Sequence, residues 1–470
     1  MEALAALLLI FAISLAAFIA MGARRDRRAR RALEEDRARG LGEPATLHPV
    51  FDPVICIGTE ACVPVCPEGD VIGIVNGRGT LVHPSRCIGH GACASACPEG
   101  AIALVFGTRR RGVELPHVEP DFETNVPGLF IAGELGGMGL IRNAVEQGRQ
   151  AVAGIAARVR ASAPSSPAHP LDLVIVGAGP AGLSASLTAQ SEQLRFETFE
   201  QDRFGGAVLS YPRQKLINSA PFRMPHYGRI PVRELSKEEL LQIWSHTVLR
   251  SGLRIRERER VEAVERVESG FRVVTARAEY ATRHVLLAIG RHGSPRKLDV
   301  EGEDLPHVTY ALVEPERVRS QTVVVVGGGN AALEAALRLA DPSFGNRVTL
   351  VHRGAHFGRA SVANREQLES CVRDGTVRLR LDTTVERIGP GRITVRSASA
   401  TEPLRADRVF VRIGGRLAAS WLQGMGVHIE TRFGTAAGDP DPLRSGGARS
   451  ARPGTQVDGT TGARRPGRRA

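Results

Sequence analysis

The sequence lacks the aromatic residues that accompany basic side chains on nucleic-acid-binding surfaces: phenylalanine, tyrosine and tryptophan make up only 4% of it. The formal net charge of +12 is largely confined to two flanks. Residues 21–40 hold eight arginines against four acidic residues, and residues 441–470 hold seven against two. The chain between these flanks is close to neutral, so we do not expect it to bind nucleic acid.

The cysteines are not distributed as in a protein stabilised by disulfide bonds. Six of the seven lie within residues 56–97 of a 470-residue chain. They form two groups, and each group ends in Cys-Pro. This pattern indicates iron–sulfur ligation in a reducing compartment rather than a disulfide framework.

Charged residues are absent from Ala3 to Ala20, a stretch about long enough to cross a membrane as a helix. The arginines that follow at once are Arg24, Arg25, Arg27, Arg28, Arg30 and Arg31. The positive-inside rule then places the N-terminus outside and the catalytic part in the cytoplasm. We predict a transmembrane helix over residues 1–22 and a basic juxtamembrane linker over 23–48, in a single-pass protein of the cell inner membrane. A cleaved signal would carry its basic residues before the apolar run, and a buried core helix is the other alternative.

Two cysteine repeats, residues 56–67 and 87–98, each lack one cysteine of the pattern C-x2-C-x2-C-x3-C-P. The matching residues are Cys56, Cys62, Cys66, Cys87, Cys93 and Cys97. Thr59 and His90 stand where a second cysteine is expected. In this pattern the fourth cysteine binds the other of two clusters. The repeats therefore predict one cluster on Cys56, Cys62 and Cys97, and another on Cys87, Cys93 and Cys66.

The fourth ligand of each cluster is left open by the two departures. His90 could bind iron, because imidazole replaces thiolate in some iron–sulfur centres. Thr59 is a poor iron ligand, so its cluster would be [3Fe–4S] or a labile [4Fe–4S]. The stretch resembles a bacterial 2×[4Fe–4S] ferredoxin domain over residues 50–106, and we place an iron–sulfur domain at 49–110. A degenerate domain with one cluster or none is the alternative.

An apolar strand at Leu171–Val176 leads into a glycine motif with Gly177, Gly179 and Gly182, and the next strand ends at Glu200. The first glycine permits a tight turn, the second lets the backbone approach a pyrophosphate, and the third allows close packing of helix and strand. The helix N-terminus would face the phosphates, and Glu200 would accept hydrogen bonds from a ribose. The complete pattern predicts a dinucleotide-binding fold.

The pattern returns after a second apolar strand at Thr322–Val326. Its cofactor-binding candidates are Gly327, Gly329, Asn330 and Ala331. The following strand ends not in an acidic residue but in His352 and Arg353, with Arg359 six residues further on. Cations at this position suit the 2′-phosphate of NADPH and leave the ribose of NADH without its usual acidic partner. NADPH is therefore expected in preference to NADH, unless these side chains are only solvated surface charges.

Two such folds in tandem resemble the two-dinucleotide-binding flavoproteins, and most closely their thioredoxin-reductase-like branch. The resemblance covers residues 171–436 and includes Val285–Gly290 and Val409–Gly415 at the two domain crossings. It implies FAD in the first fold (171–293) and the nicotinamide cofactor in the second (294–413). The remaining flavin-site candidates are Pro180, Ala181, Gly206 and Gly290. The family is commonly dimeric, so a homodimer is an expectation of the resemblance.

A piece of the first fold is displaced in the sequence. In the family, the flavin domain ends with a strand, an Ala-Gly-Asp motif and a helix, yet after the return segment 414–436 comes a Gly-, Pro- and Arg-rich stretch (437–470) that reads as disordered. Residues 124–150 resemble the missing element. We infer a permuted closing element over 121–158, followed by a linker (159–170). A vestigial duplicate is the alternative.

Permutation makes specific predictions for this segment. The strand Gly128–Ala132 would pair into the sheet of the first fold. Gly133 and Glu134 would lie at the flavin, with Glu134 in the role of the family's aspartate, and the helix after Gly139 would direct its dipole at the ring. The sequence thus predicts an α/β protein with two Rossmann-like domains, preceded by a small α+β ferredoxin-like domain and one transmembrane helix.

The predicted activity is electron transfer rather than disulfide reduction. The second fold holds only Cys371, without the Cys-x-x-Cys of thioredoxin reductases, and Ala181 stands where some low-molecular-weight disulfide reductases place a cysteine. Disulfide exchange needs an attacking thiolate and normally a resolving partner. We expect electrons to pass between NADPH, FAD and the clusters, to or from an unknown acceptor, with no residue named as acid–base catalyst. The reverse direction, a disulfide reductase, and a redox sensor without sustained turnover are the alternatives.

Overall fold

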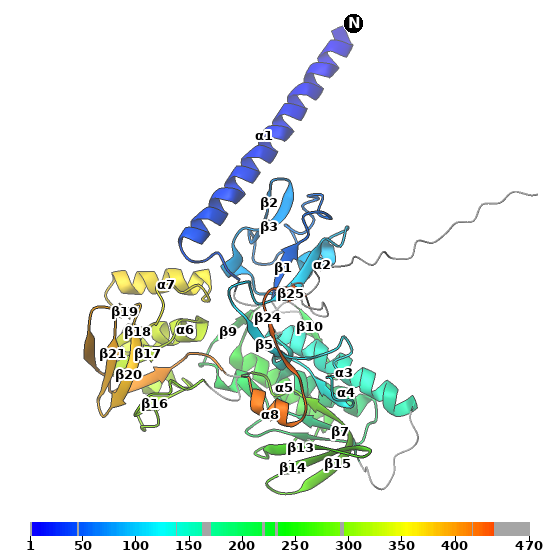
Figure 1. Cartoon of the computed structure of the whole chain (residues 1–470), viewed down its shortest axis with the longest axis vertical. Coiled ribbons are helices and arrows are strands. Elements are labelled where there is room, and N and C mark those ends of the chain that lie inside the picture. Colours follow the sequence, from blue (N-terminus) through cyan, green and yellow to red (C-terminus); the bar gives the residue numbers. More distant parts are fainter. Residues whose placement is uncertain are drawn as a thin grey trace, which may run out of the picture. The chain divides into compact units, whose positions relative to one another are not determined.

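The structure is a computed structural model, which describes residues 2–44, 47–137, 139–161, 171–218, 221–230, 234–291, 296–415 and 417–436. Two Rossmann-like domains, the first with a mixed sheet and the second with a parallel one, and a small domain with the cysteine repeats make up the fold (Figure 1). The predicted α/β class is therefore confirmed. Most of the predicted linker 159–170 and the whole predicted tail 437–470 lie outside the described residues.

Helix α1 (Glu2–Ala38) is longer than the predicted transmembrane segment 1–22 and continues through much of the basic linker. Its arginines, alanines and glutamates are good helix formers, which explains the continuation. Large apolar side chains of its first half are exposed, with Leu8 60%, Phe11 66% and Phe18 71% accessible. By length and composition this helix can cross a membrane, which is weak support for the predicted anchor.

The cysteine repeats lie in a small α+β domain. Its elements are β1 (His48–Phe51), β2 (Ile72–Val75), β3 (Arg78–Leu81), η1 (Pro84–Arg86), α2 (Ala92–Ala96) and β4 (Ile102–Phe106). β1 pairs with β4 and β2 pairs with β3, both antiparallel. The buried core contains Cys62, Val71, Ile72 and Cys93. α1 contacts this domain through a hydrogen bond from Arg30 to Asn76 (2.5 Å) and an ion pair of Arg25 with Glu60 (3.1 Å).

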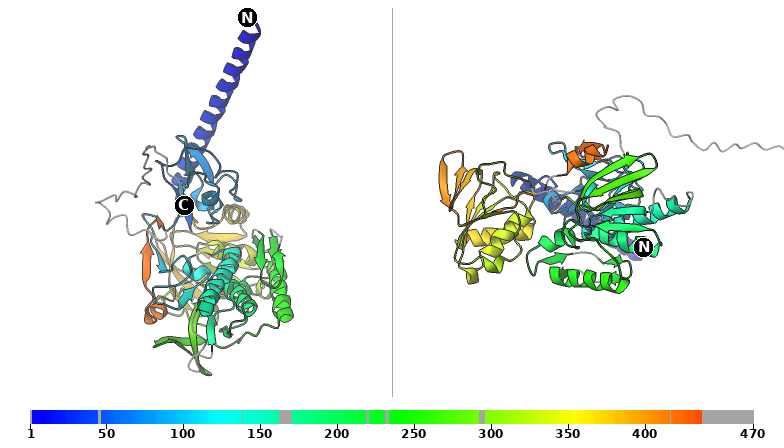
Figure 2. Two further views of the ribbon diagram at one scale, coloured as in Figure 1. Left: turned by 90° about the vertical axis from the view of Figure 1, so that its right-hand side faces the viewer. Right: turned by 90° about the horizontal axis from the view of Figure 1, so that it is seen from below.

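The first Rossmann-like domain has a six-stranded sheet, in which β15 also pairs with a strand from before the glycine motif. The sheet contains β6 (Leu129–Ile131), β7 (Leu171–Val176), β8 (Phe196–Phe199), β13 (Val261–Val267), β14 (Gly270–Thr275) and β15 (Glu279–Leu287). β6 pairs with β15 in parallel, Leu129 opposite Val285, which is the pairing predicted for Gly128–Ala132. α3 (Ile141–Ala161) and α4 (Pro180–Ser191) lie side by side (Figures 1 and 2).

The same domain carries a set of shorter elements beyond β8. They are η3 (Gly206–Ser210), β9 (Leu216–Asn218), β10 (Phe222–Met224), β11 (Gly228–Ile230), β12 (Glu234–Ser236) and α5 (Lys237–Ser251). β9 pairs with β12 and β10 with β11. Trp244 and Met224 belong to the buried core that joins these elements to α4. α5 begins with a capping box formed by Ser236 and Glu239, which satisfies its first backbone N–H groups.

The second Rossmann-like domain has a parallel sheet in the order β16-β23-β17-β18-β19. These strands are β16 (Val308–Thr309), β17 (Thr322–Val326), β18 (Arg347–Val351), β19 (Val377–Arg380) and β23 (Arg408–Val411). Its helical elements are η4 (Pro315–Arg317), α6 (Asn330–Leu339), η5 (Pro342–Phe344) and α7 (Val362–Arg373). A three-stranded antiparallel sheet joins it, formed by β20 (Thr384–Gly389), β21 (Arg392–Arg396) and β22 (Thr401–Arg405).

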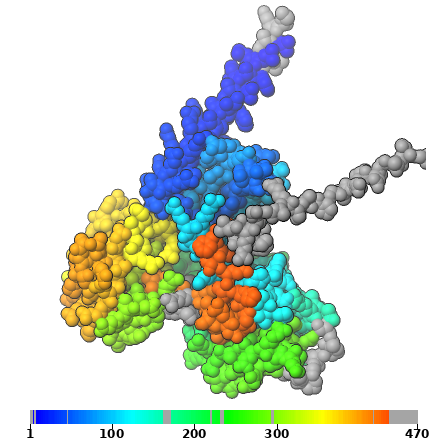
Figure 3. All heavy atoms as spheres, in the orientation of Figure 1, coloured from blue at the N-terminus to red at the C-terminus, as the bar shows by residue number. Residues whose placement is uncertain are grey.

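The return segment after the second domain reaches back to the start of the chain. It contains α8 (Ala419–Gly424), β24 (Ile429–Arg432) and β25 (Thr435–Ala436). β24 pairs with β5 (Val113–Pro116), and β25 pairs with β4 of the small domain. The return segment (orange) and the stretch that follows the cysteine repeats (cyan) therefore lie against each other on the surface (Figure 3).

Candidate functional site

A cleft of about 680 Å³ opens at the carboxyl ends of β7 and β15. Of the residues predicted from sequence, those that line it are Gly133, Glu134, Gly177, Gly179, Pro180, Ala181, Glu200, Gly206 and Gly290. They come from the segment before β7, the glycine motif, the end of β8, η3 and the end of β15. The return segment adds Leu417 and Trp421 to the wall. The structure thus brings all the predicted flavin-side residues around one cleft, except Gly182.

The glycine motif has the geometry that its sequence predicts. Gly177 adopts φ +100°, and a Cβ atom there would lie 2.7 Å from the Ala288 carbonyl oxygen. A Cβ on Gly182 would lie 1.8 Å from the Gly177 carbonyl oxygen, so this glycine permits α4 to pack on the loop. Gly179, in contrast, faces the cleft. The N-terminus of α4 is therefore open to an anion in the cleft.

Glu200 links the glycine loop to the end of β8. Its carboxylate accepts hydrogen bonds from the backbone N–H groups of Ala178 (2.8 Å) and Asp202 (3.1 Å), and only 8% of the residue is accessible. It lines the cleft beside the glycine motif. A carboxylate in this place can receive a ribose hydroxyl, as the spacing predicts.

The displaced segment meets the glycine motif directly. Gly133 adopts φ +84°, and a Cβ on it would lie 2.9 Å from the Ala181 side chain. Its N–H donates to the Gln147 side chain (2.8 Å) on α3. A Cβ on Gly148, the next residue of α3, would lie 2.1 Å from the Ala181 carbonyl oxygen. Glycines in the displaced segment thus allow its loop and helix to close against α4.

Among the cleft residues that were not predicted from the sequence are Arg291 and Tyr211. Arg291 donates to the Glu114 carbonyl oxygen (2.9 Å); burial lowers the pKa of its guanidinium, while the charge of Glu134 opposes that shift. Burial raises the pKa of Tyr211 to about 12, and the charges of Glu134 and Glu334 add to the effect. Neither residue belongs to a motif, so only the fold could reveal them.

The predicted nicotinamide-side residues gather at the carboxyl ends of β17 and β18. The His352 ring lies over the glycine loop, since a Cβ on Gly328 would be 2.1 Å from it. Arg359 forms a backbone bridge with Gly329. Asn330 accepts hydrogen bonds from the Ser361 N–H and the Asn364 side chain, so its amide oxygen ties α6 to α7.

Four arginines are close enough to influence one another at this end of the second sheet. Burial lowers the pKa of the Arg359 guanidinium, and the charges of Arg111, Arg353 and Arg296 lower it further. Arg353 and Arg359 were predicted, whereas Arg111 and Arg296 come from segments without a recognisable motif. Arg111 also donates to the Pro44 carbonyl oxygen (2.7 Å). A group of cations of this kind favours a phosphate-bearing ligand.

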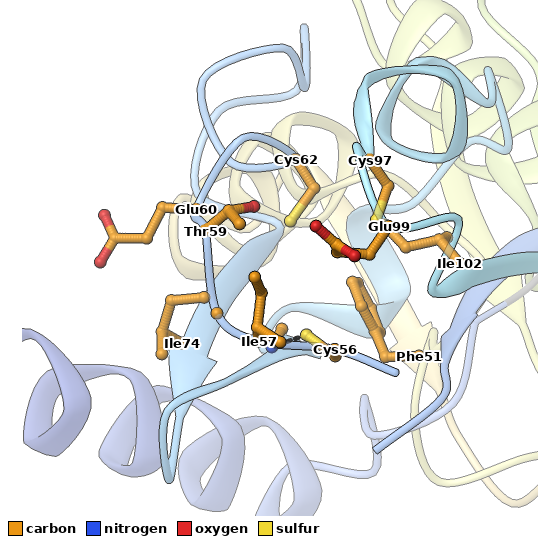
Figure 4. Close-up of a pocket in the computed structure, with 12 residues that line it drawn as sticks. Phe51, Cys56, Ile57, Thr59, Glu60, Cys62, Ile74, Cys97, Glu99 and Ile102 are labelled. Carbon is orange, nitrogen blue, oxygen red and sulfur yellow. Dashed lines mark hydrogen bonds between the residues drawn. The ribbon is translucent and has the colours of Figure 1, made fainter. Parts of the chain in front are cut away.

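The cysteines of one predicted set, Cys56, Cys62 and Cys97, line a single pocket (Figure 4). Thr59 lies in the same wall. The Gly79 N–H donates to the Cys56 sulfur (3.3 Å), and the Ala101 N–H donates to the Cys97 sulfur (3.3 Å). Backbone donors to cysteine sulfurs are among the features that tune iron–sulfur clusters. These residues therefore fit a cluster at this place.

The other predicted set, Cys66, Cys87 and Cys93, also gathers. Burial raises the pKa of the Cys87 thiol to about 11, and the nearby Cys93 and Cys66 contribute. Within the described residues no three Cys, His, Asp or Glu side chains converge as they would around a single metal ion.

His90 is oriented in a way that the sequence did not foresee. Its Nδ1 accepts a hydrogen bond from the Ala92 N–H (3.1 Å), and its Nε2 lies 3.7 Å from the Cys66 sulfur. A neutral ring with an accepting Nδ1 carries its proton on Nε2. In this orientation His90 donates toward the Cys66 sulfur, and iron ligation through Nε2 would require the Ala92 hydrogen bond to be given up.

The small domain contacts α3 and the loop before it, close to residues that line the cleft. Arg142, in the first turn of α3, donates to the His90 carbonyl oxygen (3.5 Å), and its neighbour Ile141 lines the cleft. The Phe106 ring lies against Gly137, where a Cβ would be 2.7 Å away. The second cysteine repeat therefore packs next to the helix that borders the cleft.

Known protein families match both the Rossmann-like part of the chain and the part with the cysteine repeats. Residues 174–437 match the family described as pyridine nucleotide-disulphide oxidoreductase, and residues 48–98 match the 4Fe-4S dicluster domain. The chain is 27% identical over 267 residues to bacilliredoxin reductase Bdr of Bacillus subtilis, covering 56% of this chain and 82% of the relative. It is 30% identical over 270 residues to a ferredoxin–NADP reductase of Ignicoccus hospitalis, covering 55% and 82%. The structure of bacillithiol disulfide reductase Bdr from Bacillus cereus superposes with a TM-score of 0.51 at 26% identity, covering 55% of this chain and 82% of that one.

Proposed function

This chain belongs to the pyridine nucleotide-disulphide oxidoreductase family, and we propose that it passes electrons between NADPH and its own iron–sulfur clusters by way of FAD. It is an FAD-dependent oxidoreductase whose cofactors are a flavin, a nicotinamide and iron–sulfur clusters. When bound, FAD accepts a hydride and releases electrons singly, as a route from nicotinamide to clusters requires. The proposal concerns the route and the residues that support it.

The contact between the second cysteine repeat and α3 carries the proposal. His90 lies in the loop between Cys87 and Cys93, and its backbone accepts a hydrogen bond from Arg142 at the start of α3. The residues next to Arg142 line the cleft. The cluster on Cys66, Cys87 and Cys93 is therefore assigned as the one adjacent to the flavin.

Each group of residues has a distinct task in this proposal. The N-terminus of α4 and Gly179 receive the pyrophosphate of FAD, and Glu200 holds its ribose. Glu134 and the N-terminus of α3 face the flavin from the displaced segment. Arg353 and Arg359 bind the 2′-phosphate that distinguishes NADPH from NADH. None of these residues transfers a proton to substrate, in keeping with hydride and electron transfer as the chemistry.

Disulfide reduction is the second candidate, because one relative is a bacilliredoxin reductase. Cys371 is partly buried and packs against the core of the second domain, and the other six cysteines all lie in residues 56–97. Neither a dithiol pair nor a cysteine at position 181 faces the cleft. The chain's own residues therefore favour electron transfer.

The membrane is the proposed site of action. The exposed apolar half of α1 would cross the bilayer, with the arginines after it on the cytoplasmic side. Deleting residues 2–22 should release the protein from inner-membrane vesicles without changing its flavin content. If the deleted protein still floats with vesicles, α1 is not the anchor.

The direct test is anaerobic reduction of the full-length protein in detergent. Adding NADPH should bleach the flavin absorbance and produce EPR signals of reduced clusters. Cys93→Ser should remove the signal of one cluster and leave flavin bleaching intact. If NADPH bleaches the flavin while dithionite alone reduces the clusters, the proposed route is wrong. A single reduction without turnover toward an artificial one-electron acceptor would instead indicate a sensor.

A further inference from the structure

The pocket of Cys56, Cys62 and Cys97 has three thiols for a cluster with four irons. A cubane cluster of four irons normally has four protein ligands. Thr59 stands at the second cysteine position of the sequence pattern, where the remaining ligand of this cluster is expected. Its neutral hydroxyl is a poor substitute for a thiolate. A complete ligand set in this pocket would therefore need a donor that the pattern does not contain.

A carboxylate points into this pocket. Glu99 lines it, and Figure 4 shows its carboxylate between Cys62 and Cys97. The other acidic side chain in the wall, Glu60, points away in the same view, and it is paired with Arg25 at 3.1 Å. Among the described residues the Glu99 carboxylate has neither a hydrogen bond nor an ion pair. One oxygen ligand is thus free beside three sulfurs.

The backbone after Cys97 holds Glu99 in place. The Gly100 N–H donates to the Cys97 carbonyl oxygen (3.3 Å), and the Ala101 N–H donates to the Cys97 sulfur (3.3 Å). These two bonds form a tight turn around Pro98 and Glu99. The turn therefore sets the direction in which the Cα–Cβ bond of Glu99 leaves the backbone, relative to Cys97.

We propose that Glu99 is the fourth ligand of the cluster held by Cys56, Cys62 and Cys97, and binds the iron that Thr59 cannot. Carboxylate oxygen is a common ligand of iron in proteins. Like the missing thiolate it carries one negative charge, so the net charge of the site equals that of an all-cysteine site. The inference rests on the iron–sulfur part of the proposed function, and it does not depend on the route of electrons from NADPH.

The test compares variants of the full-length protein, purified without oxygen and reconstituted with iron and sulfide. Iron and acid-labile sulfide are counted, and EPR and Mössbauer spectra are recorded before and after reduction with dithionite. Glu99→Gln should lose about one iron per chain and show the EPR signal of an oxidised [3Fe–4S] cluster. Glu99→Asp should keep part of that iron. Glu60→Gln, a carboxylate of the same wall that points away, should match the wild type.

A second substitution separates ligation from folding. Thr59→Cys restores the cysteine of the pattern, so the double variant Thr59→Cys/Glu99→Gln should regain the fourth iron. Unchanged iron content and spectra in Glu99→Gln would overturn the proposal. So would a double variant that still lacks the iron, because Glu99 would then act through the turn and not as a ligand. Dithionite reduces clusters without the flavin. The iron content and the spectra therefore test the Glu99 ligand even if the NADPH route fails.

Discussion

Replacing Gly148 with alanine tests whether the displaced segment completes the flavin domain. Gly148 is buried in α3, and a Cβ on it would lie 2.1 Å from the Ala181 carbonyl oxygen in the first turn of α4. Ordinary contacts of a Cβ begin at 3.4 Å. One helix must therefore move by roughly an ångström, and α4 carries the N-terminus that we assign to the pyrophosphate.

The magnitude follows from two opposing effects. Overpacking of a filled core costs about 1–3 kcal/mol. Alanine is a better helix former than glycine, which returns about 1 kcal/mol. Gly148→Ala should therefore lower the free energy of unfolding by up to about 2 kcal/mol. The matched control is Gly154→Ala on the same helix, where a Cβ meets nothing within 4 Å, so only the favourable helix propensity should remain.

The assay is thermal unfolding together with the FAD content of the purified proteins. Gly148→Ala should unfold at a lower temperature than Gly154→Ala. It should also hold less FAD, since a shift of α4 moves the helix N-terminus that we assign to the pyrophosphate. Equal stability and full FAD content in both variants would refute the reasoning. The segment would then be a duplicate that does not pack on the flavin motif, despite the pairing of β6 with β15.

Three further outcomes are expected. Gly179→Val should abolish FAD binding, because a branched side chain would enter the cleft where the pyrophosphate must approach, and stoichiometric flavin in that variant would contradict the assignment. Arg353→Glu should raise the Michaelis constant for NADPH at least tenfold (about 1.4 kcal/mol) and change that for NADH little, whereas equal changes would mark Arg353 as a surface charge. Burial lowers the pKa of His284 from 6.5 to about 4. The unfolded state therefore binds a proton before the folded state does, so stability should fall as the pH drops from about 6.5 toward 4. When Tm is measured against pH, the His284→Leu variant should show a smaller fall in Tm over this pH range than the wild type.

Sequence reasoning succeeded where a motif encodes local geometry. Gly177 and Gly182 must be glycine because backbone atoms of their own loop approach them, and that requirement is visible as a spacing. The cysteine pattern likewise predicted the exchange that brings Cys97 beside Cys56. Apolar runs located β7 and β17 for the same reason, since a parallel strand buried on both faces needs an unbroken apolar run.

Residues supplied by distant segments could not be predicted in this way. Arg111 and Arg296 influence Arg359 only because the chain folds back, and no local pattern marks them. The orientation of His90 depends on the Ala92 N–H, which a sequence pattern does not describe. Glu99 was visible in the sequence, directly after Cys97-Pro98, but the sequence does not show that its carboxylate lies in the pocket of Cys56, Cys62 and Cys97.

We propose that the order of the segments has a physical consequence for electron transfer. The segment that we infer to close the flavin domain begins with β6, which follows the cysteine repeats with only β4 and β5 between. The covalent connection keeps the cluster domain at a high effective concentration beside the cleft. β24 and β25 of the return segment pair with β5 and β4. The return segment therefore holds the same stretch of chain that connects the cysteine repeats to β6. Weakening these pairs, for example with proline at Thr431, should slow cluster reduction by NADPH more than flavin reduction. If both rates fall equally, the strands support the fold and not the approach of the clusters.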